Sequence, residues 1–275
     1  MPRYATAEDE WRAYLDGSHP SAHFGHFVFR LLPKGPRCRL CSVPFAGVGP
    51  LLLGPFGFTP WAKNPNLCSR CVTWLSTKDV SGAEIELSFL FADVRSSSDI
   101  ARQIGTMEFA HLMQRFYRVA TDALLAHDAI VEKFVGDEVV GFFMPLTAGE
   151  DHAAAAVRAA EHLLVATGHG DDDGPWLPLG AGVHTGTAFV GVVSSGATSD
   201  FTALGDAINV AAHVAAQAGP GEILVTDAAA AASGIDLDGL ERRSLSLKGH
   251  PVDAVVVPVP SATSNRPSSP PSANR

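Results

Sequence analysis

The sequence predicts an α+β fold, in which one β-sheet carries helices on one or both faces and a small four-cysteine module precedes it. Two observations predict this organisation. Apolar runs and helical stripes follow the order strand, two helices, hairpin, helix, hairpin, helix and further strands between residues 84 and 258. All four cysteines lie ahead of that region, in two Cys-x-x-Cys pairs.

Composition narrows the class of protein. The 275 residues are 46% hydrophobic and 18% charged, which is typical of one large or two modest folded domains. The net charge of -9 argues against nucleic acid or an anionic membrane as the main partner. Residues 40–62 are uncharged and long enough to span a bilayer, but four prolines exclude a continuous helix. We therefore expect a compact loop there, no membrane span and, without a signal peptide, a cytoplasmic protein.

The four cysteines predict a metal site within residues 1–80. Cys38 with Cys41 and Cys68 with Cys71 supply four thiolates, which suit a tetrahedral ion. We expect structural Zn2+, with an iron-sulfur cluster as the alternative, because both use sets of four thiolates and zinc is the commoner structural ion. Two disulfides are a further alternative. The ion would hold together a region too small to build a core of its own.

The elements are expected in the following order. Short helices at 8–15 and after Cys71, with an apolar segment at 24–32, belong to the first region. The second region has a strand at 85–93, helices at 97–104 and 107–126, a hairpin at 130–144, a helix at 151–166 capped by Asp151, a hairpin at 179–193 turning at Thr185-Gly186, a polar loop at 194–200, a helix at 205–217, and strands at 222–226, 240–247 and 252–257. Residues 261–275 are Ser/Pro-rich and predict a disordered tail.

Two carboxylates stand at positions that suit metal chemistry. Asp93 ends the strand at 85–93, and Asp137 lies at the turn of the hairpin at 130–144. If these strands are neighbours, both carboxylates lie at one rim of the sheet. Hard oxygen ligands suit Mg2+ or Mn2+, and two such ions suit phosphoryl or nucleotidyl chemistry. Each aspartate alone is also ordinary turn chemistry, so the surrounding motifs have to decide.

Five motifs supply that context. They are FADVRSSSD (91–99), EKFVGDE (132–138), GVHTGTAFVGVV (182–193), DFTALGDAINVAAH (200–213) and LKGHPVDAVVV (247–257). In this order they resemble the catalytic domains of class III adenylate/guanylate cyclases, over about residues 84–258. The resemblance implies a sheet with a ferredoxin-like core and packed helices. It also implies a site between two catalytic domains, so that a chain with one copy forms a homodimer.

The resemblance implies a role for each matching residue. Asp93, Asp137 and the Val94 carbonyl match the metal ligands, Lys133 and Thr202 match the base-reading pair, Asn209 matches the ribose-binding asparagine, and Lys248 matches a triphosphate-binding lysine. In adenine, Lys133 can donate to N1 and Thr202 can accept from the N6 amino group, so this pair favours ATP. The turn from Val94 to Ser97 is expected to offer free backbone N–H groups to phosphate.

Two positions depart from the family pattern. His213 stands where the family has a transition-state arginine, and histidine is shorter and mostly neutral above about pH 6.5. Ser96 stands where glycine is usual. The leading interpretation is an adenylate cyclase that makes cyclic AMP with two Mg2+ or Mn2+ ions per site. The alternatives are a degenerate cyclase domain that binds nucleotide or a partner without turnover, and a four-cysteine interaction module on a dimerisation scaffold.

Overall fold

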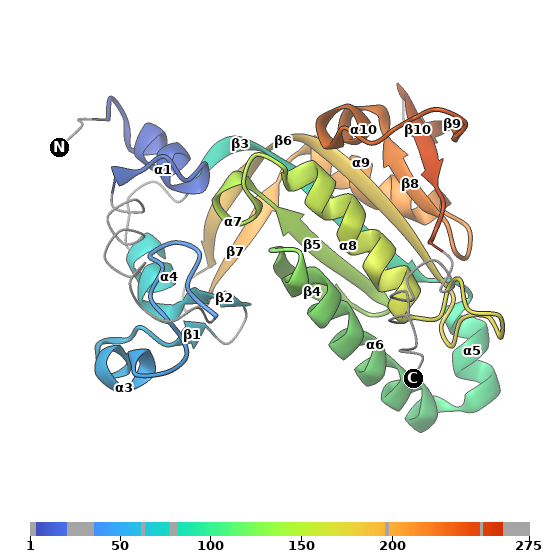
Figure 1. The fold of residues 1–275 in the computed structure, drawn as a ribbon, viewed down its shortest axis with the longest axis horizontal. Coiled ribbons are helices and arrows are strands. Elements are labelled where there is room, and N and C mark those ends of the chain that lie inside the picture. Colours follow the sequence, from blue (N-terminus) through green and yellow to red (C-terminus); the bar gives the residue numbers. More distant parts are fainter. Residues whose placement is uncertain are drawn as a thin grey trace, which may run out of the picture.

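The structure of the protein is a computed structural model that describes residues 4–20, 36–61, 64–76, 82–195, 198–247 and 250–260. The apolar segment predicted at 24–32 and the tail predicted at 261–275 lie outside these residues. The elements shown in Figure 1 are α1 (Ala7–Leu15), α3 (Gly49–Leu53), the 3-10 helix η1 (Gly54–Phe56), β1 (Pro60–Trp61), β2 (Asn64–Cys68), α4 (Ser69–Ser76), β3 (Gly82–Val94), α5 (Ser97–Ile104), α6 (Thr106–Ala126), β4 (Ile130–Val135), β5 (Glu138–Phe143), α7 (Pro145–Ala148), α8 (His152–Ala166), β6 (Leu179–Ser195), β7 (Thr198–Leu204), α9 (Asp206–Gln217), β8 (Ile223–Thr226), α10 (Asp227–Ser233), β9 (Glu241–Leu247) and β10 (His250–Val257).

The predicted α+β class is confirmed. The main sheet has the strand order β4-β5-β3-β6-β8-β10-β9, and β7 pairs with the far part of β6. Only the pairing of β6 with β8 is parallel among the described strands. The predicted helices at 97–104, 107–126, 151–166 and 205–217 and the hairpin at 130–144 are confirmed to within about two residues. Asp151 occupies the N-cap position of α8, although its side chain makes no capping hydrogen bond there.

Both faces of the central strands are buried, because successive side chains of a strand point to opposite faces. Leu90 and Ala92 of β3 face a cluster built with α6, α8 and α10. Phe89 and Phe91 face a second cluster, built with α9 and the N-terminal part of the chain. In Figure 1, α6 and α8 lie across the near face of the sheet. The sheet is therefore the middle layer between two different covers.

The hairpin predicted at 179–193 is wrong. Thr185 and Gly186 stay extended inside β6, which is one strand of 17 residues and pairs with β3 from Leu179 to Gly191. Gly186 is needed for packing rather than for a turn, since a Cβ there would lie 3.0 Å from the Ala207 Cβ of α9. Gly182 is similar, with a Cβ position only 2.3 Å from the Ala215 nitrogen. The polar loop predicted at 194–200 is also wrong, because β6 continues to Ser195 and β7 begins at Thr198.

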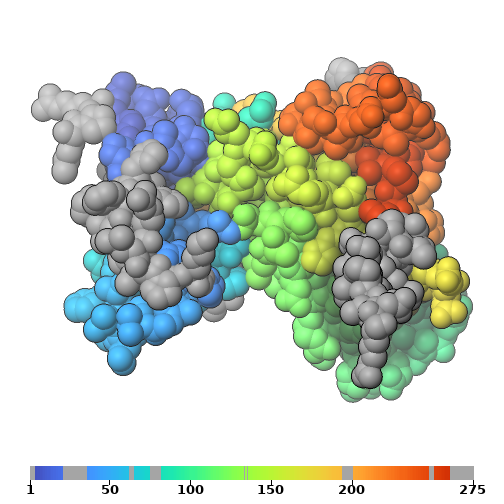
Figure 2. All heavy atoms as spheres, viewed as in Figure 1, coloured from blue at the N-terminus to red at the C-terminus, as the bar shows by residue number. Residues whose placement is uncertain are grey.

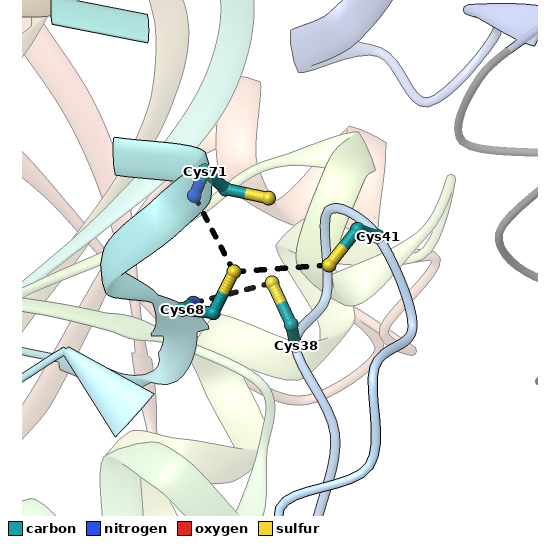
Figure 3. A group of neighbouring side chains, drawn as sticks. All are labelled: Cys38, Cys41, Cys68 and Cys71. Carbon is teal, nitrogen blue, oxygen red and sulfur yellow. Dashed lines mark hydrogen bonds between the residues drawn. The ribbon is translucent and has the colours of Figure 1, made fainter. Parts of the chain in front are cut away.

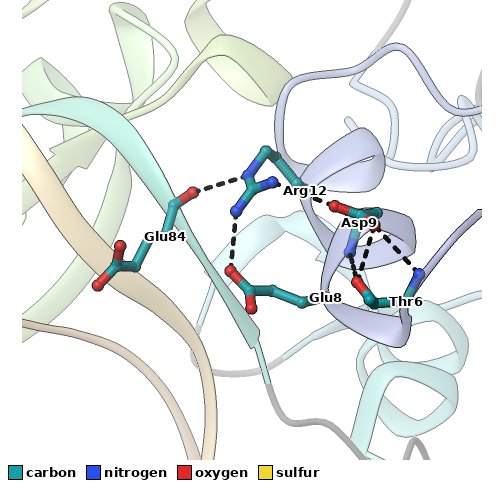
Figure 4. A network of polar contacts seen from close by, with 5 residues as sticks. All are labelled: Thr6, Glu8, Asp9, Arg12 and Glu84. Carbon is teal, nitrogen blue, oxygen red and sulfur yellow. Dashed lines mark hydrogen bonds and ion pairs between the residues drawn. The ribbon is translucent and has the colours of Figure 1, made fainter.

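The N-terminal part lies at one end of the molecule, where Figure 2 shows its residues in blue. The loop predicted at 40–62 contains the short elements α3, η1 and β1. Helix α1 starts with a reciprocal capping box between Thr6 and Asp9, and Arg12 donates from Nε to the Glu84 carbonyl of β3 at 3.2 Å (Figure 4). None of the described helices is long and apolar enough to cross a membrane.

Candidate active site and four-cysteine centre

Asp93 and Asp137 come together at one rim of the sheet. In the pairing of β3 with β5, Asp93 lies opposite Glu138, the residue after Asp137. The Val94 N–H donates to the Asp137 carbonyl at 3.1 Å, which ties the end of β3 to the β4–β5 turn. Gly136 has φ +64, as the first central position of a type II′ turn requires. A two-residue turn with glycine in that place directs the next residue, Asp137, to the rim.

The charges at this rim suit a bound cation. Burial raises the pKa of the Asp93 carboxyl, Arg95 lowers it, and the neighbouring Asp137 raises it. Arg95 Nη2 lies 2.5 Å from Asp93 Oδ2, and its Nη1 donates to the carbonyls of Ala216 and Ala218 at the end of α9. Paired carboxylates that repel each other offer the hard oxygen donors that Mg2+ or Mn2+ prefers, so the residues present fit such ions. Sequence reasoning missed Arg95, whose partners on α9 lie more than 120 positions away.

The β4–β5 turn is also held from the helix side. Tyr117 of α6 donates its hydroxyl hydrogen to the Gly136 carbonyl, and its ring lies 4.6 Å from the Phe134 ring between centroids. A cavity of about 530 Å³ opens between α5, α6 and this turn, and Ser97, Met113 and Asp137 are among its lining residues. The rim that carries Asp93 and Asp137, called the metal rim below for the ions it is predicted to bind, therefore borders a space large enough for part of a nucleotide.

The turn after β3 differs from the prediction. The Val94 N–H is taken by Asp137, and the Arg95 N–H donates to the Pro178 carbonyl at 2.8 Å, so neither is free for phosphate. Ser96 has a left-handed conformation, with φ 56 and ψ 31, at the N-cap of α5. Glycine adopts this conformation without the steric cost that a side chain adds.

The residues predicted to read the base lie on β4 and β7. Thr202 of β7 donates from Oγ1 to Glu132 Oε1 at 2.9 Å. The register of β4 against β5 shifts between Val131 and Lys133, so Glu132 is the extra residue of a bulge. The Lys133 backbone pairs with Val140, while its side chain lies outside the described part of the structure. Sequence reasoning also missed Glu132, although its place next to Lys133 in EKFVGDE was a signal that could have found it.

Helix α9 carries two predicted site residues on an exposed face. Asn209 and His213 are both exposed and one turn apart. Asn209 lies seven residues before Ala216, which makes it about 10 Å along the helix axis from the carbonyl that Arg95 binds. Lys248 lies outside the described residues. Within one chain the structure thus brings together Asp93 with Asp137, and Thr202 with β4, but it leaves Asn209 and His213 facing outward.

The four cysteines converge, as Figure 3 shows. The Sγ atoms of Cys38, Cys41, Cys68 and Cys71 all lie within 4.8 Å of one another, and none of the four is in a disulfide. Cys41 Sγ is 3.7 Å from Cys68 Sγ. A tetrahedral ion with metal–sulfur bonds of about 2.3 Å separates its ligand sulfurs by about 3.8 Å. The cysteine cluster therefore fits a single thiophilic ion.

Two contacts join this centre to β4. Arg39, next to Cys38, donates its N–H to the Asn66 carbonyl at 2.8 Å, and its guanidinium pairs with Asp128. Asn66 Nδ2 donates to the Ala129 carbonyl at 3.2 Å. Asp128 and Ala129 lead directly into β4 at Ile130. The cysteine centre is thus attached to the strand that leads to Glu132 and Asp137.

Comparison with known proteins identifies the family. The sequence model of one protein family, the adenylate and guanylate cyclase catalytic domain, matches residues 81–256. The chain belongs to this family. The match covers the whole sheet, both aspartates and helix α9, and it leaves the four cysteines outside. The predicted resemblance to class III cyclases and their fold is confirmed.

Relatives differ in what is known of them. An uncharacterised protein of Mycobacterium tuberculosis is 27% identical over 183 residues, covering 62% of this chain and 32% of its own length. Adenylate cyclase 1 of Rhizobium meliloti is 28% identical over 134 residues, covering 47% of this chain and 20% of the relative. The matched part thus spans a third or less of these relatives.

Solved structures show the same fold. The guanylyl cyclase Cya2 aligns with a TM-score of 0.59 at 20% identity, over 66% of this chain and 97% of that chain. The adenylyl cyclase CyaB from P. aeruginosa aligns with a TM-score of 0.55 at 24% identity, over 65% of this chain and 96% of that chain. Adenylyl and guanylyl cyclases therefore share this fold, and the fold alone does not select the substrate.

Proposed function

We propose that the chain is an adenylate cyclase that converts ATP into 3′,5′-cyclic AMP and pyrophosphate. The observation that carries the proposal is the meeting of Asp93 and Asp137 at one rim, in a chain whose family catalyses this class of reaction. Relatives named adenylate cyclase in Rhizobium meliloti and Anabaena cylindrica support the choice of product. We place the catalytic domain at residues 84–258 and the protein in the cytoplasm.

The chain's own residues supply distinct parts of the reaction. Asp93, Asp137 and the Val94 carbonyl would hold two Mg2+ or Mn2+ ions, which when bound polarise the 3′-hydroxyl and neutralise phosphate charge. Lys133 and Thr202 read the adenine base, Asn209 orients the ribose, and Lys248 binds the triphosphate. The 3′-oxygen bonds to the α-phosphorus, the bond to the β-phosphate oxygen breaks, and the hydroxyl proton leaves to solvent.

Two chains complete the site in this proposal. Asn209 and His213 face outward on α9, so a second copy is needed to set them against the metal rim of the first. The cyclase family model matches the chain once, which supports a homodimer with two equivalent sites.

The second candidate function is a degenerate domain that binds nucleotide without turnover. It is favoured by His213, which offers no fixed planar charge, and by the left-handed Ser96 at the turn after β3.

The four cysteines bind Zn2+ in our proposal. Their mutual distances fit one tetrahedral ion, whereas an iron-sulfur cluster inserts several irons and sulfides and needs a wider cage. Elemental analysis of the purified protein tests this, with one zinc per chain expected. Iron with visible absorbance would indicate the alternative.

The test of activity is incubation of the purified protein with ATP or GTP and Mn2+ or Mg2+, from mildly acidic to mildly alkaline pH, with mass detection of products. Cyclic AMP that disappears in Asp137→Asn is expected. Cyclic AMP that persists in this variant would reject the metal assignment. Nucleotide binding without any product would favour the degenerate domain.

A further inference from the structure

Glu132 has no assigned role, and it occupies an unusual position. It is the extra residue of the bulge in β4, one position before the base-reading Lys133. A bulge re-aims the side chain it carries, and bulges are frequent next to active sites. Here the re-aimed carboxylate is half-buried and reaches Thr202 on β7, 70 positions away in the chain. The contact joins two strands that are not neighbours in the sheet.

The direction of this hydrogen bond fixes what Thr202 can offer a ligand. A threonine hydroxyl has one hydrogen to donate and two lone pairs that accept, and it rotates to suit its partner. The Thr202 hydrogen is donated to Glu132 Oε1 at 2.9 Å. With the hydrogen used, only the lone pairs of Oγ1 remain for a base.

Adenine and guanine differ at the atom such a hydroxyl would meet. Adenine carries an amino group at C6, which donates, whereas guanine carries a carbonyl oxygen there, which accepts. A hydroxyl that rotates freely serves either base. A hydroxyl whose hydrogen is held elsewhere accepts from the adenine amino group and places a lone pair against the guanine oxygen.

We propose that Glu132 is the residue that makes Thr202 selective for adenine, by holding its hydroxyl hydrogen away from the base. This inference rests on the proposed function and concerns substrate selection at the same site. Glu132 is a positioning residue, because it acts through Thr202 and does not contact the reacting atoms. The discrimination against GTP then arises because a lone pair of Thr202 Oγ1 faces guanine O6, which is also an acceptor, and no hydrogen lies between them.

The experiment compares Glu132→Gln with the wild type, using kcat/KM for ATP and for GTP. Glutamine has the same shape, but its amide nitrogen can donate to Thr202 and release the hydroxyl hydrogen for guanine O6. We expect the ATP/GTP ratio of kcat/KM to fall about tenfold, mainly through a lower KM for GTP, with kcat for ATP changed less than about threefold. Glu108→Gln removes the same charge at the exposed start of α6 and is expected to leave the ratio unchanged.

A double-mutant cycle with Thr202→Val separates this role from a general effect on the strand. Without the hydroxyl, Glu132→Gln has nothing to release, so the double variant is expected to match Thr202→Val alone. In a Thr202→Ser background, which keeps a hydroxyl, the effect of Glu132→Gln is expected to persist. The proposal would be overturned if Glu132→Gln left the ATP/GTP ratio of kcat/KM unchanged. Additive effects of Glu132→Gln and Thr202→Val on this ratio would also overturn it.

Binding of 3′-deoxy analogues of ATP and GTP keeps this test apart from the test of activity. These analogues lack the attacking hydroxyl and cannot be cyclised, so their dissociation constants report the base site alone. A protein without turnover, but with an ATP-analogue preference that Glu132→Gln reduces about tenfold, contradicts the proposed activity and supports the role of Glu132. A wild-type chain that binds neither analogue, or that prefers the GTP analogue, overturns the role of Glu132.

Discussion

Removal of the metal from the four-cysteine centre should loosen the strand that leads to the active site. The link runs through Asn66, which binds the Ala129 carbonyl, and through the Arg39 pair with Asp128. Because the proposed ion would fix the geometry of the cysteine loops, chelation is expected to release both contacts. The two residues that lead into β4 then lose these attachments.

The size of the effect follows from those contacts. The hydrogen bond to Ala129 contributes about 1 kcal/mol, and the partly exposed ion pair contributes up to about 1 kcal/mol. Since 1.4 kcal/mol is a factor of ten in an equilibrium constant, a loss of about 1–2 kcal/mol raises the open population of β4 roughly 5- to 30-fold. Hydrogen exchange at its backbone amides should accelerate by the same factor.

Hydrogen exchange followed by mass spectrometry, with and without a chelator, measures this directly. Peptides that cover residues 129–135 are expected to exchange faster after chelation, while peptides from β10, next to the last strand at the opposite end of the sheet, serve as the internal control. Asn66→Ala should accelerate exchange about fivefold with the metal still bound. If chelation disorders residues 36–76 and leaves 129–135 unchanged, the link between the centre and β4 does not exist.

Three further predictions concern the site itself. Ser96→Gly removes the side chain from a residue with a left-handed backbone and should raise the free energy of unfolding in urea by about 0.5–1 kcal/mol. The control Ser98→Gly, inside α5, should lower this free energy by about 0.5 kcal/mol. Equal effects of the two substitutions would show that the backbone of Ser96 is not strained. His213→Arg should raise kcat at least tenfold, because one transition-state donor typically contributes about 100- to 1000-fold. The melting temperature should stay unchanged, because position 213 is exposed. An unchanged kcat would show that position 213 does not act in the reaction. Burial raises the pKa of Asp93, so Mn2+ affinity should fall with decreasing pH around a midpoint above the pKa of an ordinary aspartate, and Arg95→Ala should move it higher because Arg95 lowers this pKa. For the same reason the Asp93 carboxyl contributes stability below its unfolded pKa, and that stability is lost as pH rises through its folded pKa, which acid titrations of unfolding can measure. A pH midpoint of Mn2+ binding below the pKa of an ordinary aspartate would contradict the prediction for Asp93.

Elements with a strong local pattern were predictable from the sequence. The apolar stripe of α6 and the Gly136-Asp137 turn between two β-branched runs each fix a structure within a few residues. Helix α10 was missed although local signals existed, since Thr226 caps it, alanines fill it and Gly234 ends it in the left-handed conformation.

Other features depend on contacts between distant residues, and the sequence could not reveal them. Glycine is typical of turns, but Gly186 lies inside strand β6. Glycine is needed at this position because helix α9 approaches too closely for a side chain. The hydrogen bond from Thr202 to Glu132 and the bond of Arg95 to the end of α9 likewise join residues about 70 and 120 positions apart. The roles assigned to all the site residues stay predictions, and for Lys133 and Lys248 even the position is open, because the side chain of the first and all of the second lie outside the described residues.

The position of the N-terminal part would give an ion bound by the four cysteines a route to the cyclase domain. Strand β3 buries Leu90 on one face and Phe89 on the other, so the sheet needs a cover on both sides. Helices α6 and α8 cover the first face, and on the second Cys38 and Cys68 belong to the same hydrophobic cluster as Phe89. The sulfur ligands are thus part of the core against which β4 packs, rather than of a separate appendage. A change in the coordination of the four cysteines is therefore expected to alter the packing around β4, which positions Glu132 and Asp137. The physical reason is that a close-packed core has low compressibility and transmits strain.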